Sequence, residues 1–429
     1  MKSTLMPTSL SLTDTAFLPT QLFFNRMLAD PPLVLQKRSS QLVQDIKENI
    51  AAHQGWIGFD SFMHQALYTS DLGYYAGGMQ KFGEDGDFIT APMLGDFFAF
   101  ALAKQCDEIF SRLNAETENS SLSKESPTKE RAIMEFGAGD GRLAVELLRQ
   151  MEQQGLGIDH YFIVETSNDL QQRQKEAVAN AGLELASKVS WLQCLPESGF
   201  DGIVIGNELL DALPVKRFMI DERGEAMEVG VAIEDQQLIW QRSDHRLDPA
   251  YQARLAQYHL PMGYHSEIGI QAEAWVRSVG EKLTSGVMLL IDYGFCANEY
   301  YHPDRFEGTM MCHYRHHAHG DPFFYPGLQD ITAHIDFSAM AAAAKEVGLK
   351  LCGYSPQGGF LLSLGVLDHL AACQERFEED PKKYFELSSQ IKTLTLPHEM
   401  GELFKVMVLS KSPIGKLTGF SLQDHRARL

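Results

Sequence analysis

The chain has 429 residues, 44% of them hydrophobic, and a formal net charge of −20. This length accommodates a large α/β domain with one or two additions, and the apolar content is enough for a sizeable core. The negative charge excludes nucleic acid as the main partner, because phosphate binding needs a basic surface, whereas cationic partners are tolerated. No apolar run reaches the roughly 18 residues of a membrane span, so we expect no membrane partner.

The six cysteines are scattered and form no C-x-x-C pair, which is typical of reduced thiols. The first 40 residues hold few basic residues and no continuous apolar core, so they resemble neither a secretory signal nor a presequence. From these observations we expect a cytoplasmic location.

The N-terminal part, residues 1–95, is expected to form a helical region that caps the rest of the chain. Four prolines in residues 1–37 predict a loosely structured start, and 82–90 form a glycine-rich loop. The polar residues 114–131 predict a linker. Apolar residues at helical spacing predict helices near 41–52, 59–68 and 97–113.

Residues 96–429 are expected to form the main α/β domain. Short apolar runs predict seven strands, at 132–136, 161–165, 189–192, 202–206, 287–292, 349–354 and 403–409. Helical patterns separate most of them, which predicts βαβ units and a seven-stranded, mostly parallel sheet. Insertions are expected near 215–265, 295–335 and 366–400. Alternation within the first insertion predicts a small meander that walls the site, with runs at 215–220, 227–233 and 237–240.

The most informative stretch is 132–142, where an apolar run carries Glu135 and is followed by Gly137, Gly139 and Gly141. Apolar residues then repeat every four positions, on one face of a helix. The pattern therefore predicts a strand, a tight glycine turn and a helix. Such a turn lets a cofactor approach bare backbone at a helix N-terminus.

The glycine spacing discriminates among cofactors. The dinucleotide fingerprint is G-x-G-x-x-G, but here Arg142 occupies the place of its third glycine, and no phosphate-loop pattern occurs. A carboxylate at Glu135 would repel a pyrophosphate, yet it suits a cationic amine or sulfonium. S-adenosylmethionine has both, and its own carboxylate can lie at the positive helix end. We therefore predict this cofactor; the alternative is a turn without a ligand.

A second acid strengthens the prediction. The strand at 161–165 ends in Glu165, which lies 24 residues after Gly141. In strand–helix–strand cofactor folds, an acid about 20 residues past the glycines holds ribose hydroxyls. A solvated acid at a strand end is the alternative for Glu165 taken alone.

Polar residues also follow the strand at 202–206. Asn207, Glu208 and Asp211 come directly after it, at the sheet edge where a methyl acceptor would lie. If the acceptor is arginine, carboxylates can bind its charged guanidinium group and neutralise charge during methyl transfer. Glu208 and Asp211 are the candidates, because a spacing of three residues brings both to one side of a helical turn.

Four histidines lie within seven residues, at His313, His316, His317 and His319. Zinc ligands normally come from two separate places at set spacings, and here Arg315 sits among the histidines. We therefore expect no metal, and interpret this stretch as a polar loop over the substrate site or a merely exposed loop.

Several motifs together resemble the MidA family of S-adenosylmethionine-dependent methyltransferases, which includes the mitochondrial complex I assembly factor that dimethylates an arginine of a core subunit. The similarity extends from about residue 73 to 410. Its motifs occupy 73–75, 86–90, 135–141, 207–214, 292–294, 326–337 and 400–406.

The resemblance implies a Rossmann-like class I methyltransferase fold and further cofactor contacts at Asp87 and Thr90. It also implies that Glu135, Glu165 and the three glycines contact the cofactor, and that Asn207, Glu208 and Asp211 face the transfer site. One departure is that the family tends to carry Pro-Glu shortly after the threonine, where this chain has Pro92–Met93.

Three functions are consistent with these features. The first is a protein arginine methyltransferase, with a protein substrate and no metal; its arginine specificity rests on the family resemblance. The second is a non-catalytic assembly factor that binds S-adenosylmethionine, and the third is a small-molecule methyltransferase. A nicotinamide dehydrogenase is disfavoured by the glycine spacing. A homodimer is an open alternative to a monomer.

Overall fold

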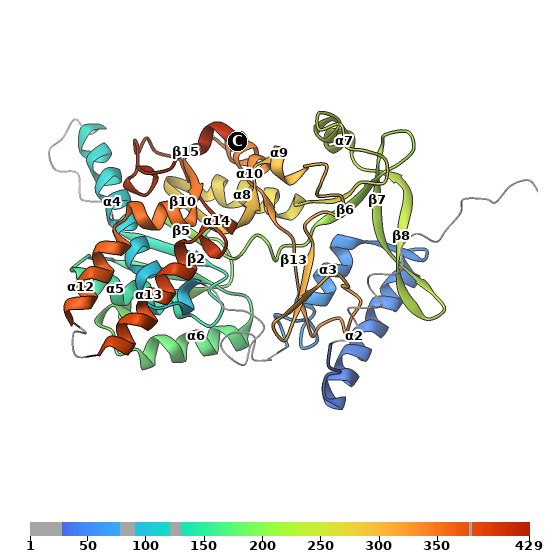
Figure 1. The fold of residues 1–429 in the computed structure, drawn as a ribbon, viewed down its shortest axis with the longest axis horizontal. Helices are drawn as coiled ribbons and strands as arrows, with labels where there is room; N and C mark the ends of the chain where they lie inside the picture. Colours follow the sequence, from blue (N-terminus) through green and yellow to red (C-terminus); the bar gives the residue numbers. More distant parts are fainter. Residues whose placement is uncertain (1–27, 78–90, 121–129, 377–379) are drawn as a thin grey trace, which may run out of the picture.

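The protein is described here by a computed structural model that covers residues 28–77, 91–120, 130–376 and 380–429. Its centre is an eight-stranded sheet with helices on both faces (Figure 1). Seven of these strands lie side by side in the spatial order β15–β16–β10–β5–β2–β3–β4. The eighth, β14, pairs with β10. The strands are β2 (Ala132–Phe136), β3 (His160–Val164), β4 (Val189–Leu192), β5 (Phe200–Asn207), β10 (Leu283–Phe295), β14 (Ile335–Asp336), β15 (Lys350–Pro356) and β16 (Phe404–Ser410).

Each of the seven predicted strands is present, but the predicted strand number is wrong, because the sheet has eight strands of mixed direction. Strand β16 runs antiparallel to both β10 and β15, whereas β10, β5, β2, β3 and β4 pair in parallel. The eighth strand, β14, extends over only two residues. So short a strand leaves no alternation in the sequence, and only its pairing with Gly294 and Phe295 reveals it.

Both faces of the sheet are buried, as is usual for parallel strands covered by helices. In β10, Val287, Leu289 and Ile291 pack into one core with α4 and α5, while Met288 and Leu290 pack into another with α8 and α10. The covering helices are α4 (Phe97–Ser120), α5 (Arg142–Gln154), α6 (Asn168–Asn180), α8 (Ile270–Lys282) and α10 (Phe337–Glu346).

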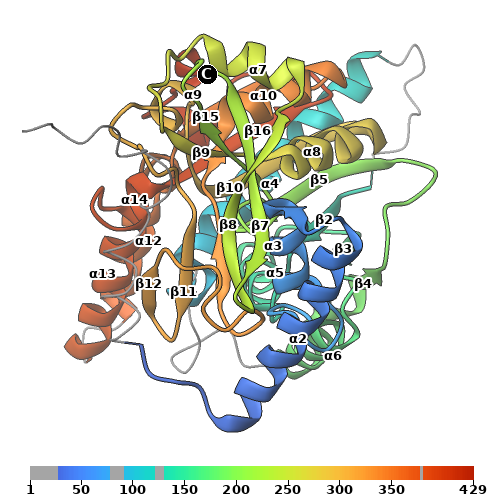
Figure 2. The same cartoon turned by 90° about the vertical axis from the view of Figure 1, so that its right-hand side faces the viewer.

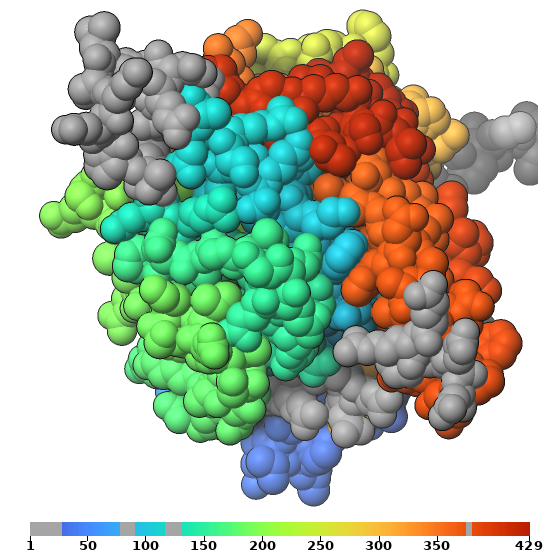
Figure 3. Space-filling model, turned by 90° about the vertical axis from the view of Figure 1, so that its left-hand side faces the viewer, coloured from blue at the N-terminus to red at the C-terminus, as the bar shows by residue number. Residues whose placement is uncertain are grey.

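The C-terminal helices join the α4 side of the sheet. Phe360, Val366 and Ile391 belong to the same core as α4 and α5. Figure 3 shows this face, with α4, α5 and α6 lying beside the C-terminal part of the chain. The helices are α11 (Gln357–Ser363), α12 (Val366–Arg376), α13 (Pro381–Thr395) and α14 (Met400–Leu403).

A second sheet of five strands lies apart from the first, on the right of Figure 1 and facing the viewer in Figure 2. It contains the predicted meander, as β6 (Lys216–Ile220), β7 (Ala226–Glu234) and β8 (Gln237–Arg246), together with β1 (Trp56–Gly58) and β9 (His265–Ile268). The pairing of β1 with β7 joins the N-terminal region to the first insertion. Helices α2 (Leu33–Ala52) and α3 (Phe59–Tyr68) pack against this sheet, and α7 (Pro249–Ala256) follows β8.

A third, three-stranded sheet is formed by the second insertion in the order β12–β11–β13. Its strands are β11 (Met311–Tyr314), β12 (His317–His319) and β13 (Asp330–Thr332), and α9 (Ala297–Tyr300) precedes them. The histidine-rich stretch is therefore a β-hairpin. Short 3-10 helices complete the described chain, at η1 (Ala91–Met93), η2 (Glu184–Lys188), η3 (Thr418–Phe420) and η4 (Arg426–Arg428).

Two local predictions need correction. The expected linker at 114–131 begins too early, because α4 continues to Ser120. The loosely structured start at 1–37 ends too late, because α2 begins at Leu33. At the first place α4 propagates into polar sequence, and at the second α2 begins directly after its N-cap Pro32. Among the helices that the structure describes, none combines the length and the apolar character needed to cross a bilayer.

Candidate active site

A cavity of about 1150 Å³ opens at the carboxyl ends of β2, β3 and β5. Ligands of open α/β sheets bind at this edge. The volume is at the upper end of what a single small ligand needs, so it has room for a cofactor and part of a second molecule.

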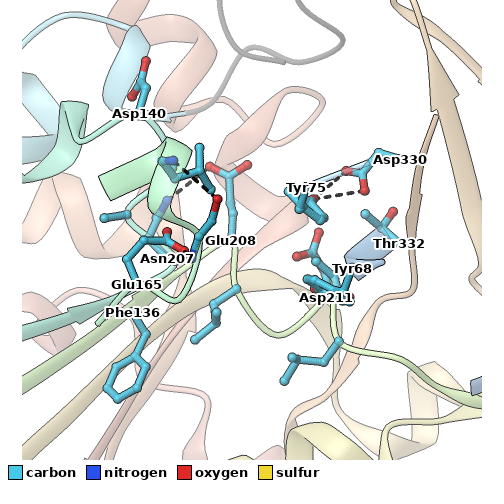
Figure 4. A pocket seen from close by; sticks show the side chains of 18 of the residues that line it. Tyr68, Tyr75, Phe136, Asp140, Glu165, Asn207, Glu208, Asp211, Asp330 and Thr332 are labelled. Atoms are coloured by element: carbon cyan, nitrogen blue, oxygen red, sulfur yellow. Dashed lines mark hydrogen bonds between the residues drawn. The ribbon is translucent and has the colours of Figure 1, made fainter. Parts of the chain in front are cut away.

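Two groups of side chains face each other across this cavity, with Glu208 between them (Figure 4). The glycine wall consists of residues 135–140 and 164–170, at the ends of β2 and β3. The tyrosine wall consists of Tyr68, Tyr75, Asp211, Asp330 and Thr332. These come from α3, the loop after it, the turn after β5, and β13.

The glycine turn has the backbone that its sequence predicts. Gly137, Gly139 and Gly141 have φ angles of 68°, 53° and 86°, in the left-handed region that favours glycine. Gly137 and Gly139 line the cavity, but Gly141 does not. Instead Gly141 is the N-cap of α5, where a Cβ atom would lie 3.1 Å from the Cα of Gln174. The structure therefore places Gly141 under the turn, away from the ligand space.

Glu135 lines the cavity from the end of β2 and is almost fully buried. Its Oε2 accepts a hydrogen bond of 2.7 Å from the Tyr161 hydroxyl. Burial raises the pKa of Glu135 to about 7, although this hydrogen bond opposes the rise. A cation beside it would favour the carboxylate form, so the site suits a positively charged group of a ligand.

Glu165 follows β3 and is held in place by two donors. Its Oε1 accepts from the backbone N–H of Ser167 at 2.8 Å, and its Oε2 from Nε2 of Gln174 at 3.2 Å. The same Gln174 nitrogen also donates to the Gly139 carbonyl at 3.0 Å, so this buried amide joins both parts of the glycine wall. Sequence reasoning missed Gln174, because no local pattern marks a helical glutamine as buried.

The turn after β5 carries the predicted acceptor-side residues. Glu208 has a φ of 48°, which is strained for a residue with a side chain. The turn is held by Asp292 at the end of β10, whose Oδ2 accepts from the backbone N–H groups of Leu209, Leu210 and Asp211 at 3.2, 2.8 and 3.3 Å. Asp292 is buried beneath the turn, and its role is to shape the backbone that presents Glu208 and Asp211.

Asn207 is buried at the end of β5 and lines the cavity. Its Nδ2 donates to Oε1 of Glu208 at 3.2 Å, which leaves Oδ1 as an acceptor without a hydrogen-bond partner among the described residues. A buried acceptor left unpaired is costly, so this atom fits a ligand N–H group.

The carboxyl groups around the turn disfavour one another's charged forms. Burial, followed by the charge of Asp292, raises the pKa of Glu208 to about 8. The same two causes raise the pKa of Asp211 well above its usual range, with further contributions from Asp330 and Glu208. Burial also raises the pKa of Asp292 to about 7. A cation in this part of the cavity would be strongly favoured.

The sequence did not single out Asp330, Tyr75 or Tyr68 as site residues. Asp330 is buried on β13, and both of its carboxylate oxygens are 3.0 Å from the Tyr75 hydroxyl. The rings of Tyr68 and Tyr75 stack with centroids 5.6 Å apart. The segments that carry Tyr75 and Asp330 belonged to the family motifs, but nothing local in the sequence indicated that they meet.

The histidines divide between cavity and surface. His313 lines the cavity, as does His334 from the segment after β13, and burial lowers the pKa of each to about 4, so both rings are neutral at pH 7. His316 and His317 are exposed at the hairpin tip. In the part of the chain that the structure describes, no three His, Cys, Asp or Glu side chains are grouped to hold a metal ion.

Two predicted cofactor contacts, Asp87 and Thr90, lie outside the described residues. The residues that follow them reach the site: Pro92 and Met93 line the cavity, and a hydrogen bond from the Ala91 backbone lowers the pKa of Glu208. The backbone just after Thr90 is therefore close to the candidate acceptor site.

A family model described as "Putative S-adenosyl-L-methionine-dependent methyltransferase" matches residues 101–355. This chain belongs to that family. It is an S-adenosylmethionine-dependent methyltransferase, and the resemblance to the MidA family is confirmed.

Solved structures support the methyltransferase fold. A protein from Burkholderia thailandensis bound to S-adenosyl-homocysteine is 40% identical, with a TM-score of 0.83, and the alignment covers 94% of this chain and 100% of the other. A native structure from the same organism is 39% identical over the same shares, with a TM-score of 0.81.

Curated relatives are more distant. "Protein arginine methyltransferase NDUFAF7, mitochondrial" from Danio rerio is 26% identical over 87% of this chain and 90% of its own length. The human protein of that name is 27% identical over 83% of this chain and 80% of its own. These relatives are named as mitochondrial, which contradicts the expected cytoplasmic location. That expectation depended on a missing presequence pattern, and a missing pattern is not evidence of a location.

The glycine wall fits S-adenosylmethionine, the cofactor of the family. The left-handed turn at Gly137 and Gly139 leaves bare backbone on the cavity, and Glu135 offers a carboxylate for a cationic group. The unpaired Oδ1 of Asn207 is available to an amine of the cofactor or of the acceptor.

Proposed function

We propose that the protein transfers methyl groups to arginine side chains of a protein substrate. The observation that carries this proposal is the set of acids Glu208, Asp211 and Asp292, whose pKa values are raised by burial and which have no ion-pair partner among the described residues. A guanidinium keeps its charge and donates five N–H bonds, so it complements such a site better than a neutral acceptor does. The relatives named as protein arginine methyltransferases support this acceptor.

In this proposal the two ligands occupy opposite sides of the cavity. Glu135, Gly137, Gly139 and Glu165 hold the cofactor, and Asp87 and Thr90 remain predictions for the same role. When bound, S-adenosylmethionine supplies an electrophilic methyl group on a positively charged sulfur. Asn207, Glu208 and Asp211 orient the acceptor nitrogen toward it, and such orientation is the main catalytic task of the protein.

Glu208 accepts the proton that the acceptor nitrogen loses. A free guanidinium has a pKa above 12, so the proton leaves during or after methyl transfer, when the nitrogen lone pair has entered the new N–C bond. Burial raises the pKa of Glu208 to about 8 without ligands. A bound guanidinium opposes this rise and favours the carboxylate, which is the form able to take the proton.

The proposal is tested by mass spectrometry of methylated arginines in cells with and without the gene. We expect at least one methylarginine peptide to disappear on deletion and to return with the native protein but not with Glu208→Gln. Return of the modification with Glu208→Gln would show that Glu208 is not the proton acceptor, and it is the result expected of a non-catalytic assembly factor. If no methylarginine changes while a methylated metabolite disappears, the small-molecule alternative is favoured.

A further inference from the structure

We propose that Asp330 and Asp211 form a two-carboxylate clamp that selects a guanidinium as acceptor, and that Tyr75 orients Asp330 for this role. This inference rests on the proposed function and adds the residues that determine its specificity. Both acids line the same cavity and contribute to the same electrostatic cluster. In Figure 4 they lie on one side of the cavity, with Tyr75 beside both.

The carboxylate of Asp330 is held in a defined orientation. Its Oδ1 accepts from the backbone N–H of Ile331 at 2.9 Å, and the Tyr75 hydroxyl lies 3.0 Å from each of its two oxygens. A carboxylate has about four acceptor sites, so it can accept from several donors at once. Because its side chain is already ordered, Asp330 can bind a planar guanidinium group without a further loss of rotamer freedom on binding.

Tyr75 is itself positioned by packing and by backbone contacts. Its ring stacks on Tyr68 at an interplanar angle of 21°. The loop that carries it is held by Arg38 of α2, whose guanidinium donates to the carbonyls of Gly77, Leu72 and Gly73 at 2.6, 3.1 and 3.1 Å. The N-terminal region therefore sets the position of the Tyr75 hydroxyl.

The backbone around Asp211 is hydrogen-bonded to the segment after β13 and to Tyr68. Its carbonyl accepts from the backbone N–H of Ala333, just after β13, at 2.9 Å. The Tyr68 hydroxyl donates to the next carbonyl, that of Ala212, at 2.9 Å. These bonds fix the turn after β5 relative to β13, so the two acids form one unit although they are 119 residues apart in sequence.

The chemistry of two separate carboxylates favours a guanidinium over other cations. A guanidinium spreads its charge over a plane and presents N–H groups on several edges, so it can engage both acids at once. An ammonium is a compact point charge and donates in a narrower region. Citrulline has the shape of arginine without its charge, so it would lack the charge–charge attraction to the two acids.

The test is a binding experiment with small probes on the full chain saturated with S-adenosyl-homocysteine. N-acetyl-arginine methylamide is titrated by calorimetry and compared with the corresponding lysine and citrulline derivatives. We expect the order arginine, then lysine, with citrulline weakest. Citrulline binding as tightly as arginine, or no binding of the arginine probe to the native protein, would overturn the clamp.

Variants then separate the roles of the residues. Asp330→Asn is expected to weaken the arginine probe by about 10-fold or more, because a charged hydrogen-bonding partner is lost. Tyr75→Phe keeps the ring stacking and removes the hydroxyl, so we expect a smaller loss. Both should leave the affinity for S-adenosyl-homocysteine unchanged, which shows that the variants are folded. The surface variant Asp304→Asn, at a side chain 94% exposed, controls for the change in net charge.

The two proposals fail in different ways. If the arginine probe binds but Asp330→Asn does not weaken it, the clamp is wrong and arginine methylation stands. If lysine binds better than arginine and Asp330→Asn weakens that binding, the acids bind a cation but the proposed arginine acceptor is wrong.

Discussion

The two walls of the cavity are built in different ways. The glycine wall comes from two consecutive strand–turn–helix units, and its hydrogen bonds join residues such as Gly139, Glu165 and Gln174, within 35 positions of one another. The tyrosine wall joins α3, the loop after it, the turn after β5, and β13. The contact between Tyr75 and Asp330 alone joins residues 255 positions apart.

This difference separates two functions that share one cavity. The glycine wall is part of the main sheet and offers the backbone surface and acids that suit a nucleoside cofactor. The tyrosine wall depends on the N-terminal region and the insertions, which are free to vary without changing the sheet. We therefore expect changes on the glycine wall to alter cofactor affinity, and changes on the other side to alter methyl transfer or acceptor affinity.

The largest effect is expected at the boundary between the walls. Glu208→Gln removes the proposed proton acceptor and should lower kcat by roughly 10²–10⁴-fold, measured by transfer of labelled methyl groups to extract from cells lacking the gene. Affinity for S-adenosyl-homocysteine should be unchanged. Equal loss of affinity and turnover would assign Glu208 to the cofactor instead.

The pH dependence of kcat/KM, compared between the native protein and Glu208→Gln, gives a second measurement of the same role. Because burial raises the pKa of Glu208 to about 8, its carboxylate form increases as pH rises through that value. The native kcat/KM should therefore rise as pH rises through about 8 and level off above it, and this limb should be missing from the residual activity of Glu208→Gln. The matched control is Glu307→Gln, at a side chain 71% exposed.

A smaller effect is expected on the glycine wall itself. Gly139→Val places a β-branched residue at a φ of 53° on the cavity, which is strained and fills ligand space. We expect calorimetry to show affinity for S-adenosylmethionine reduced on the order of 100-fold. Gly155→Val is the control, because Gly155 has a φ of 68° at the end of α5 and no atom of the described residues within 4 Å of its Cβ position. It should lower stability without changing affinity; unchanged affinity in Gly139→Val would contradict the role of the turn.

The smallest effect concerns the residue that joins the two halves of the glycine wall. Gln174→Leu removes the donor to the Gly139 carbonyl and to Glu165, and the acceptor of the Trp191 indole N–H. Loss of buried hydrogen bonds of this kind should weaken cofactor binding by about 10-fold. Gln172→Leu, on the exposed side of the same helix, should have no effect on binding. Equal behaviour of the two variants would show that Gln174 does not support the site.

The sequence predicted the backbone of the glycine turn, because the signals for it are local. An acid, alternating glycines and a helical face follow one another within 132–154, and the backbone conformation that the glycines favour is the one observed. The seven principal strands and the meander were found for the same reason, since period and turn residues mark them. The predicted cytoplasmic location was wrong, because it depended on the absence of a presequence pattern.

The sequence by itself determined the order of the seven principal strands, the bend at Gly137–Gly139 and the acids beside it, because those features follow from residues close together in the chain. Only the tertiary structure decided that β1 and β14 exist, that β16 runs antiparallel to its neighbours, and that Tyr75 meets Asp330 on the same side of the cavity as Asp211. The physical reason is that such contacts are selected by burial and pairing between distant segments, for which no local pattern exists.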